Sequence, residues 1–344
     1  MKYTREYMQD LIRIREVIPN LEALKDKTIL VTGANGLICS AVVDFLAQLN
    51  LEANYRITIL CAARNREKTQ KRFQDFFSAG VVEYVSYDAM KLFEPGWEVD
   101  YVIHGASNAN PRYYMEQPVE TMLGNLMGVT NLLELLRKQK KGRMLFLSSS
   151  EVYGQKTTMD SYREEDYFFV DLLNPRSCYP SSKRAAETLC ASYQKEYGTD
   201  YVIARPGHVY GSTMLDSDNR ISSQFLRDAK QGKDLVMKSE GKQIRSYCYV
   251  LDCVSAMITI LLNGASGGAY NISNKDSVCS IAQMAEMIAD ISGVKLKKEL
   301  PSHIEAAGFN PMDNSSLHSD KLEALGWRGL FNLEQGMRSA FHSI

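Results

Sequence analysis

Short apolar runs alternate with helical patterns along the first two thirds of the chain. Runs of strand length, rich in β-branched and aromatic residues, occupy residues 28–32, 56–62, 81–86, 100–105, 143–148 and 200–205. Between these runs, apolar residues recur with helical spacing, most clearly at 37–49, 118–139 and 180–197. Strands and helices that alternate over short connections form βαβ units. The pattern therefore predicts an α/β fold, with a doubly wound parallel sheet covered by helices on both faces.

The alternation loosens after residue 206, where turns and short strands accompany helical patterns near 252–262, 280–292 and 333–343. This change predicts a smaller C-terminal α/β lobe at 207–344, beside a parallel-sheet domain at 27–206. Ligands of such sheets bind beyond the carboxyl ends of the strands. We therefore expect the lobe to hold a substrate over that edge.

The first segment of the chain, residues 1–26, has the pattern of an amphipathic helix. Its apolar side is formed by Tyr7, Leu11, Ile14, Ile18 and Leu21. The segment is too charged for a signal peptide, and no apolar run in the chain approaches the length of a membrane span. We expect a helical extension that packs on the domain body or on a second subunit.

A glycine-rich turn follows the first predicted strand. In TGANGLICS, Gly33 and Gly36 stand where a dinucleotide-binding turn has its first two glycines, which permit the tight turn and the approach of backbone to the pyrophosphate. An ordinary strand–helix turn is the alternative, but the position between a strand and a helix favours cofactor binding. Cys39 replaces the third glycine, so we expect it at the helix–strand contact, away from the cofactor. The residues assigned to the cofactor loop are Gly33, Asn35, Gly36, Leu37 and Ile38.

The end of the second predicted strand lacks the acid that binds the ribose hydroxyls of NAD. The stretch LCAARNREK has no acidic residue before Glu67, and it carries Arg64 and Arg66. A basic residue at this place accommodates the additional phosphate of NADP. Two interpretations stay open: tolerance of or preference for NADP, with Arg64 near the cofactor, or simply the solvated start of a charged helix.

A tyrosine and a lysine occur four residues apart at the start of a predicted helix. In YPSSK, Tyr179 and Lys183 share one helix face, and the lysine charge would favour the phenolate of a general base. Tyr87 and Lys91 have the same spacing, so position decides. Tyr179 follows the strand that ends in LSSSEVYG, whose hydroxyls emerge at the carboxyl edge of the sheet. Ser149 in that stretch can hydrogen-bond the same substrate oxygen as Tyr179.

These motifs belong to an ordered series along the chain, which reads TGANGLI, HGASNANPRYYMEQP, SSSEVYG, YPSSKRAAE, ARPGHVYG, RSYCYVLD and KLEALGW. From about residue 27 to 340 the chain resembles the extended short-chain dehydrogenases/reductases that act on nucleotide sugars. The resemblance implies a Rossmann domain that binds NAD or NADP, a nucleotide-sugar lobe, and a homodimer formed through helices at about 118–138 and 180–197. It implies that the catalytic residues are Ser149, Glu151, Tyr179 and Lys183.

The resemblance also assigns binding residues. Besides the glycine loop and Arg64, the cofactor would contact Asp88, Ala89, Ala106, Ser107, Tyr179, Lys183 and Pro206. The nucleotide sugar would contact Tyr113, Ser150, His208, Gln224 and Arg245. In this assignment Arg245 lies at the diphosphate or the sugar.

The residues after the fifth predicted strand distinguish the reactions of the family. Nucleotide-sugar 4,6-dehydratases carry Thr-Asp-Glu there and plain 4-epimerases usually lack the glutamate, whereas Ser149-Ser150-Glu151 is similar to the Thr-Ser-Glu of UDP-glucuronate decarboxylases. The expected reaction is therefore transient oxidation of the sugar C4 hydroxyl and decarboxylation of UDP-glucuronate to a UDP-pentose. Because His208 replaces the usual asparagine and the ribose-binding acid is missing, three alternatives stay open: a 4,6-dehydratase, a 4-epimerase or an NADPH-dependent nucleotide-linked ketose reductase.

Composition and charge argue against other classes of protein. The 344 residues carry a net charge of −1, without the basic stripe that nucleic acid or an anionic membrane selects. The seven cysteines form no C-x-x-C pair and the histidines add no metal-ligand spacing, so we expect no metal site and reduced thiols in a cytoplasmic protein. An inactive dinucleotide-binding scaffold is the alternative from another class, and the set of Ser149, Tyr179 and Lys183 argues against it.

Overall fold

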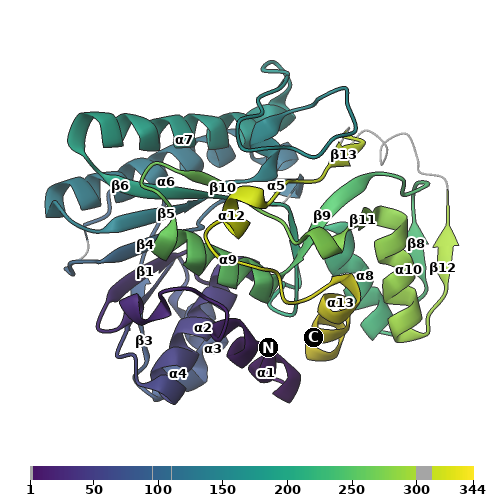
Figure 1. The fold of residues 1–344 in the computed structure, drawn as a ribbon, viewed down its shortest axis with the longest axis horizontal. Coiled ribbons are helices and arrows are strands. Elements are labelled where there is room, and N and C mark those ends of the chain that lie inside the picture. Colours follow the sequence, from purple (N-terminus) through teal and green to yellow (C-terminus); the bar gives the residue numbers. More distant parts are fainter. Residues whose placement is uncertain (1–2, 95, 110, 300–311) are drawn as a thin grey trace.

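The fold is built on a parallel β-sheet of seven strands (Figure 1). The computed structural model describes residues 3–94, 96–109, 111–299 and 312–344. The strands of the large sheet are β1 (Thr28–Thr32), β2 (Thr58–Ala63), β3 (Val82–Ser86), β4 (Tyr101–His104), β5 (Arg143–Leu147), β6 (Asp200–Pro206) and β10 (Ala269–Ile272). Their spatial order is β3-β2-β1-β4-β5-β6-β10, so the direction of winding reverses between β1 and β4. The Rossmann-type sheet expected from the sequence is confirmed.

Helices cover both faces of this sheet. On one face α6 (Pro118–Gln139) packs against α7 (Cys178–Tyr197), and on the other α2 (Leu37–Ala53) packs against α9 (Val250–Asn263). Successive residues of each strand therefore enter two different cores. In β1, Val31 belongs to the core on the α2 side, whereas the neighbouring Leu30 belongs to the core on the α6 side. Burial on both faces explains why these strands are continuous apolar runs.

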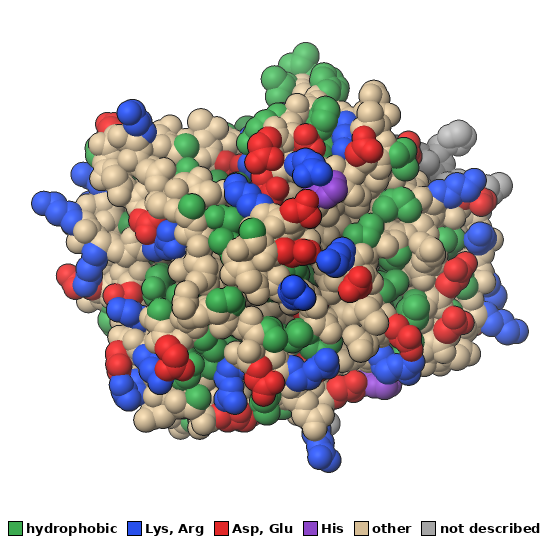
Figure 2. Space-filling model, viewed as in Figure 1, with side chains coloured by type: hydrophobic (Ala, Val, Ile, Leu, Met, Phe, Trp, Pro, Cys, Tyr) green, Lys and Arg blue, Asp and Glu red, His purple; other side chains and the backbone are tan. Residues whose placement is uncertain are grey.

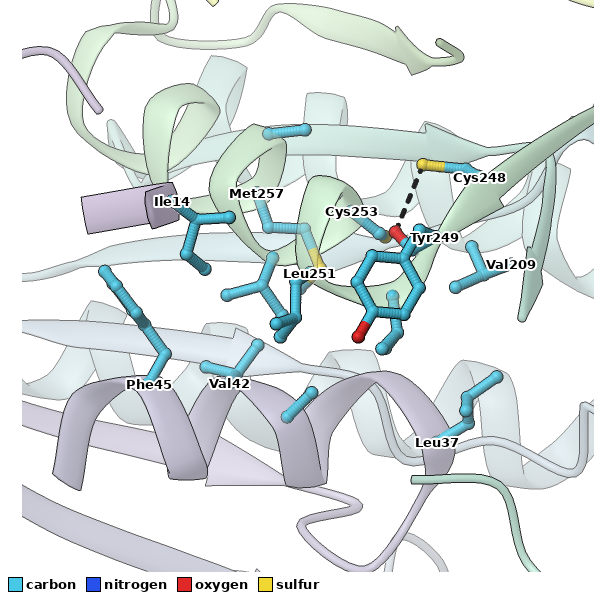
Figure 3. Packing of buried hydrophobic residues seen from close by; sticks show 14 of the residues in the cluster. Ile14, Leu37, Val42, Phe45, Val209, Cys248, Tyr249, Leu251, Cys253 and Met257 are labelled. Atoms are coloured by element: carbon cyan, nitrogen blue, oxygen red, sulfur yellow. Dashed lines mark hydrogen bonds between the residues drawn. The ribbon is translucent and has the colours of Figure 1, made fainter. Parts of the chain in front are cut away.

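The core between α2 and α9 also includes the N-terminal helix α1 (Arg5–Arg15). Ile14 of α1 lies in one cluster with Phe45 of α2 and Met257 of α9 (Figure 3). The helical extension thus packs on the domain body, which is one of the two positions expected for it.

A buried carboxylate fixes the N-terminal segment to α2. Asp44, whose side chain is inaccessible to solvent, accepts hydrogen bonds from the hydroxyls of Tyr3 (2.8 Å) and Tyr7 (2.9 Å). Arg72, the last residue of α3 (Arg66–Arg72), pairs with the same carboxylate at 2.5 Å. These contacts hold α1, α2 and α3 together on one face of the sheet.

A smaller lobe lies to one side of the large sheet (Figure 1). Its central strand β9 (Ile244–Tyr249) pairs with β7 (His208–Tyr210), β11 (Val278–Ser280) and β13 (Asn314–Ser315), and β8 (Leu235–Met237) pairs with β12 (Leu296–Lys298). Its longer helices are α8 (Ile221–Lys230), α10 (Ile281–Ser292) and α13 (Leu333–Ser343). The segment 207–344 also returns to the large sheet, because its strand β10 pairs with β6.

Short helices and turns connect these elements. They are α4 (Gln74–Ser78), α5 (Pro111–Glu116), α12 (Asp320–Glu323) and the 3₁₀ turns η1 (Leu21–Leu24), η2 (Ser150–Tyr153), η3 (Pro175–Ser177) and η4 (Lys275–Ser277). Acidic and basic side chains are interspersed over the face shown in Figure 2. Among the described residues, no helix has the length and apolar character needed to cross a membrane.

Candidate active site

The glycine turn after β1 lies very close to the backbone that follows β4. Gly33 has a φ of +70°, and a Cβ on it would lie 2.9 Å from the backbone of Ala106, beyond the end of the neighbouring strand β4. Gly36 is the N-cap of the 17-residue helix α2 and has no side chain to cap its first N–H groups. Both features fit the diphosphate of a dinucleotide, which the N–H groups at the start of α2 would hold.

Side-chain hydrogen bonds fix this turn on two sides. Asn35 Nδ2 donates to Thr69 Oγ1 of α3 at 2.9 Å. The carbonyl of Leu37 accepts a hydrogen bond from Thr213 of the lobe at 2.7 Å. Leu37 is buried, whereas Ile38 is half-buried in the first turn of α2. The turn is thus connected both to the segment after β2 and to the lobe.

Cys39 lies at the contact between α2 and the end of β4, as the sequence predicted. Its side chain is 2% exposed, and its Sγ occupies the space that a Cβ on Gly105 would need. Burial raises the pKa of the Cys39 thiol to about 12, which keeps it protonated and unreactive. Close packing of helix and strand is therefore preserved without the third glycine of the turn.

The other residues assigned to the cofactor follow the carboxyl ends of the sheet strands. Arg64 follows β2, Asp88 and Ala89 follow β3, Ala106 and Ser107 follow β4, and Pro206 ends β6. The order of the sheet reverses between β1 and β4. Ligands of doubly wound sheets bind at that reversal, so the chain places these residues around an expected cofactor site.

Ser149, Tyr179 and Lys183 meet beyond the end of β5. Ser149 caps the turn η2, with its Oγ accepting the N–H of Glu151 at 3.2 Å. Tyr179 and Lys183 lie one turn apart on α7, and Lys183 Nζ donates to the carbonyl of Leu147, the last residue of β5, at 2.8 Å. A hydrogen bond with Ser149 acts on the phenol and opposes the rise of the Tyr179 pKa. The structure therefore brings the three residues together.

Burial shifts the two titratable groups of α7 toward their neutral forms. It raises the pKa of Tyr179 to about 12 and lowers the pKa of Lys183 to about 7. Lys183 Nζ lies 5.8 Å from the centroid of the Tyr179 ring and bonds to a backbone carbonyl. Desolvation is the largest effect on the Tyr179 pKa and the charge of Glu151 adds to it, so the neutral phenol is favoured here, whereas the sequence led us to expect the phenolate.

The ring of Tyr114, in α5, covers the Tyr179 phenol. The two rings stack with their centroids 4.5 Å apart and an angle of 17° between their planes, and both side chains are buried. Sequence reasoning assigned the adjacent Tyr113 to the substrate, but Tyr113 is 40% exposed. A helix of six residues is too short for periodicity to indicate which of two neighbouring tyrosines points inward. The structure shows that Tyr114 is the one that stacks on Tyr179, and the assignment of Tyr113 to the substrate stays a prediction.

Glu151 is oriented by an arginine that sequence reasoning missed. Both Nη atoms of Arg176 donate to the Glu151 carboxylate, and the guanidinium lies 5.6 Å from the centroid of the Tyr114 ring. Arg176 precedes Tyr179 by three residues, so its place beside the catalytic helix was visible in the sequence. Its partner was not, because Glu151 comes from a different segment.

Charges of the lobe act on the same group of residues. The charge of Arg220 opposes the raised pKa values of Tyr114 and Tyr179. Burial, together with the charges of Arg245 and Arg220, lowers the pKa of His208 to about 3, so this histidine is neutral. Arg220, itself paired with an aspartate, is a second residue of this region that sequence reasoning missed.

Arg245 is a buried arginine that forms no direct ion pair within the described part of the chain, although the charge of Asp313 acts on it. It is 3% exposed, its Nη1 donates to the carbonyl of Ile244 at 2.9 Å, and burial lowers its pKa. A buried charge without a counter-ion is unfavourable, so this position suits an anionic ligand. Of the other residues assigned to the substrate, Ser150 is buried in η2. Gln224 is exposed on α8 and forms no side-chain hydrogen bond within the described residues.

A buried ion pair connects the catalytic helix to the turn after β5. Arg205 of β6 is 2% exposed and pairs with Glu187 of α7 through contacts of 2.6 and 2.9 Å. The same guanidinium donates to the hydroxyl of Tyr153 in η2 at 3.1 Å and to the carbonyl of Glu164 at 2.8 Å. Glu187 also lies one turn beyond Lys183, and its charge raises the Lys183 pKa against the effect of burial.

Known proteins resemble this chain over nearly its whole length. UDP-glucuronic acid decarboxylase 1 of Xenopus tropicalis is 31% identical over 343 residues, which cover 98% of this chain and 78% of that protein. UDP-glucuronic acid decarboxylase 6 of Arabidopsis thaliana is 32% identical over 310 residues, which cover 90% of this chain and 86% of that protein.

Solved structures share the fold. UDP-glucuronic acid 4-epimerase from Bacillus cereus, solved with UDP-glucuronic acid and NAD, has a TM-score of 0.76 at 21% identity and covers 92% of this chain and 98% of its own. dTDP-glucose 4,6-dehydratase from Bacillus anthracis, solved with NAD, has a TM-score of 0.75 at 20% identity and covers 92% and 96%. The model of one family matches residues 29–273, from β1 through α7 to the returning strand β10. The chain therefore belongs to the NAD dependent epimerase/dehydratase family.

Proposed function

We propose that this protein oxidises the C4 hydroxyl of a nucleotide sugar transiently and decarboxylates UDP-glucuronate to a UDP-pentose. The observation that carries the proposal is the turn Ser149-Ser150-Glu151, whose glutamate is held by Arg176 beside the stacked rings of Tyr114 and Tyr179. The two relatives described above are UDP-glucuronic acid decarboxylases by name and align over 90% or more of the chain, which supports the same reaction here.

The residues of the chain have distinct tasks in this reaction. A bound nicotinamide supplies a hydride acceptor, and later a hydride donor, at the sugar C4. Ser149 and Tyr179 hold the C4 oxygen. Tyr179 takes its proton as the carbonyl forms, and does so as a phenolate, which the positive charge of an oxidised nicotinamide nearby would favour over the neutral phenol. The new carbonyl stands β to the C5 carboxylate, so carbon dioxide leaves while the electron pair is held as an enolate, and C5 then takes a proton. Glu151, fixed by Arg176, orients the sugar.

The charges of the lobe suit this substrate. A UDP-uronate carries negative charge on the diphosphate and on the sugar carboxylate. Arg245 is buried without a direct ion pair among the described residues, and the charge of Arg220, which is paired with Asp218, reaches Tyr114 and Tyr179. Both guanidinium groups would donate charge-assisted hydrogen bonds to an anionic ligand. Their presence favours a nucleotide sugar whose sugar ring carries a carboxylate over one whose sugar ring is uncharged.

The direct test is incubation with UDP-glucuronate, following carbon dioxide and the sugar product. We expect equal amounts of carbon dioxide and UDP-pentose, with no net change of the nicotinamide. Tyr179→Phe should abolish turnover while dinucleotide binding remains. Tyr197→Phe is the matched control, because it removes a hydroxyl from the exposed end of the same helix. Turnover of dTDP-glucose without turnover of UDP-glucuronate would identify a 4,6-dehydratase, and UDP-galacturonate as the product a 4-epimerase.

A second candidate is an NADPH-dependent reductase of a nucleotide-linked ketose. It is favoured by the absence of an acid at the end of β2, where Ala63 is followed by Arg64. This activity would consume one NADPH for each keto sugar, whereas the decarboxylation leaves the cofactor unchanged. An inactive scaffold would instead retain its function in cells that carry Tyr179→Phe.

We also propose that two copies associate through α6 and α7. One face of α6 exposes an apolar stripe with helical spacing, formed by Val119, Met122, Leu123 and Met127. All seven cysteines are free and buried, which suits a reducing compartment such as the cytoplasm.

A further inference from the structure

The expected cofactor site ends, on the side of β2, at a strand end without a carboxylate, and the first acidic residue beyond it is Glu67 in α3. The last two residues of β2, Ala62 and Ala63, are buried, and the first residue beyond them is Arg64. The carbonyl of Ala62 accepts the N–H of Gly33 at 3.0 Å, so this strand end lies directly beside the glycine turn. In dinucleotide sites of this architecture, the adenosine ribose is recognised at this strand end.

The segment around Arg64 has a fixed position relative to the glycine turn. Thr69, buried in α3, donates to the carbonyl of Asn65 at 2.8 Å and accepts from Asn35 of the turn at 2.9 Å. Asn65 in turn caps α3 by accepting the N–H of Lys68 at 2.8 Å. Arg64 stands between the end of β2 and this cap, so its backbone is constrained on both sides.

The guanidinium of Arg64 is available for a ligand. Its side chain is exposed and has no ion pair or hydrogen bond to any residue that the structure describes. The two neighbouring arginines are occupied: Arg66 lies over the ring of Tyr84, 5.7 Å from its centroid, and Arg72 pairs with the buried Asp44. Of these three arginines, Arg64 is therefore the one that can move toward an incoming anion.

We propose that this chain binds NADP(H) in preference to NAD(H), with Arg64 pairing with the 2′-phosphate of the adenosine ribose. Arginine presents two parallel N–H groups that match a phosphate, and the charges of Arg66 and Lys68 add to the attraction. An NAD site places a carboxylate against the ribose hydroxyls, where it would repel a 2′-phosphate. Here the corresponding strand end carries only alanine methyl groups. The proposal rests on family membership and does not depend on which sugar is modified.

The test is equilibrium binding of NADPH and NADH to the full chain, measured by the fluorescence of the reduced nicotinamide without any sugar. Nucleotide that co-purifies is first removed and identified, and NADP is expected. NADPH should then bind about tenfold more tightly than NADH at low salt. Added salt should narrow the difference between the NADPH and NADH affinities, because it screens an exposed guanidinium–phosphate pair. Arg64→Gln should weaken the binding of NADPH but not of NADH, and so bring the two affinities within about twofold of each other.

Two further variants make the assignment specific. Arg66→Gln is the matched control: it removes the same charge two residues away and should retain the NADPH preference. Ala63→Asp adds the missing carboxylate and should shift the preference to NADH. The proposal is overturned if the unmodified protein carries NAD or binds NADH at least as tightly as NADPH. It is also overturned if Arg64→Gln weakens both dinucleotides equally, or if Arg66→Gln alone removes the preference. Because no sugar is present, these outcomes are independent of the UDP-glucuronate assay.

Discussion

The sulfur of Cys39 fills the space that any side chain on Gly105 would need. Cys39 belongs to the first turn of α2, which follows β1, and Gly105 directly follows β4. The dinucleotide would bind beyond the carboxyl ends of these two neighbouring strands, β1 and β4. The small residue that this fold needs at the helix–strand contact is thus on the strand side, opposite its usual place in the glycine turn. The two positions are complementary in volume.

Gly105→Ala should therefore destabilise the protein by about 1–3 kcal/mol, because the added methyl group overlaps the Cys39 sulfur. Cys39→Ala introduced together with Gly105→Ala should recover most of the loss. Urea unfolding of the single and double variants measures this coupling. Strictly additive effects would show that the two side chains do not compete for space. Dinucleotide affinity should change little in Cys39→Ala, and markedly tighter binding would mean that the cysteine impairs the site.

Lys183 predicts a specific pH dependence of stability. Its pKa is about 7 in the folded protein, against an ordinary value of 10.5. Between these values the unfolded chain holds the proton and the folded chain does not, so the free energy of unfolding rises with pH by up to about 1.4 kcal/mol per pH unit. Lys183→Met should lack this rise. Urea unfolding of both cofactor-free proteins at pH 7.5 and 9.5 tests this, and parallel pH profiles would contradict it.

The pair of Arg205 and Glu187 predicts a large loss of stability when one partner is removed. Arg205→Met should lower the free energy of unfolding by about 3–5 kcal/mol, because Glu187 remains buried without its counter-charge. Arg137→Met, which breaks the partly exposed pair of Arg137 and Glu134, is the control and should cost less than about 1 kcal/mol. Thermal unfolding measures both. Similar losses in the two variants would show that burial of the Arg205 pair is not the cause.

The apolar stripe of α6 predicts a dimer that charge can disrupt. Leu123→Glu with Met127→Glu should convert the dimer to a monomer, because two carboxylates would be desolvated in the interface. Leu51→Glu, an exposed position at the end of α2, is the control and should stay dimeric. Light scattering gives the molar mass. A dimer that persists in the double variant would place the interface elsewhere.

Strands, helices and tight turns depend mainly on residues that are close in sequence, and local patterns predicted most of them. The apolar runs predicted six of the seven strands of the large sheet, all except β10, and the glycine spacing predicted the turn beside β1. The position of Tyr179 after the serine-rich turn was sufficient to bring it to Ser149 and Lys183. In a parallel sheet, the residues that follow each strand lie at the same edge. The order of these residues along the chain was therefore enough to place them together.

Contacts between distant segments were beyond that reasoning. The stacking of Tyr114 on Tyr179 joins residues from different helices, and the Arg176–Glu151 pair joins a helix to a turn. The spacing of Tyr179 and Lys183 also could not reveal how deeply both are buried, and burial dominates their pKa values. Spacing in the sequence showed that Tyr179 and Lys183 are neighbours, whereas tertiary packing determined their pKa values.

Strand β10 has a consequence for the evolution of this protein. Since β6 forms hydrogen bonds with β5 on one edge and with β10 on the other, the chain passes through the lobe before it completes the large sheet. A fragment that ended at residue 206 would leave the β6 edge open to pairing with other chains. The lobe is therefore no interchangeable module. Replacing the whole segment 207–344 would also remove a strand from the sheet on which α7 packs.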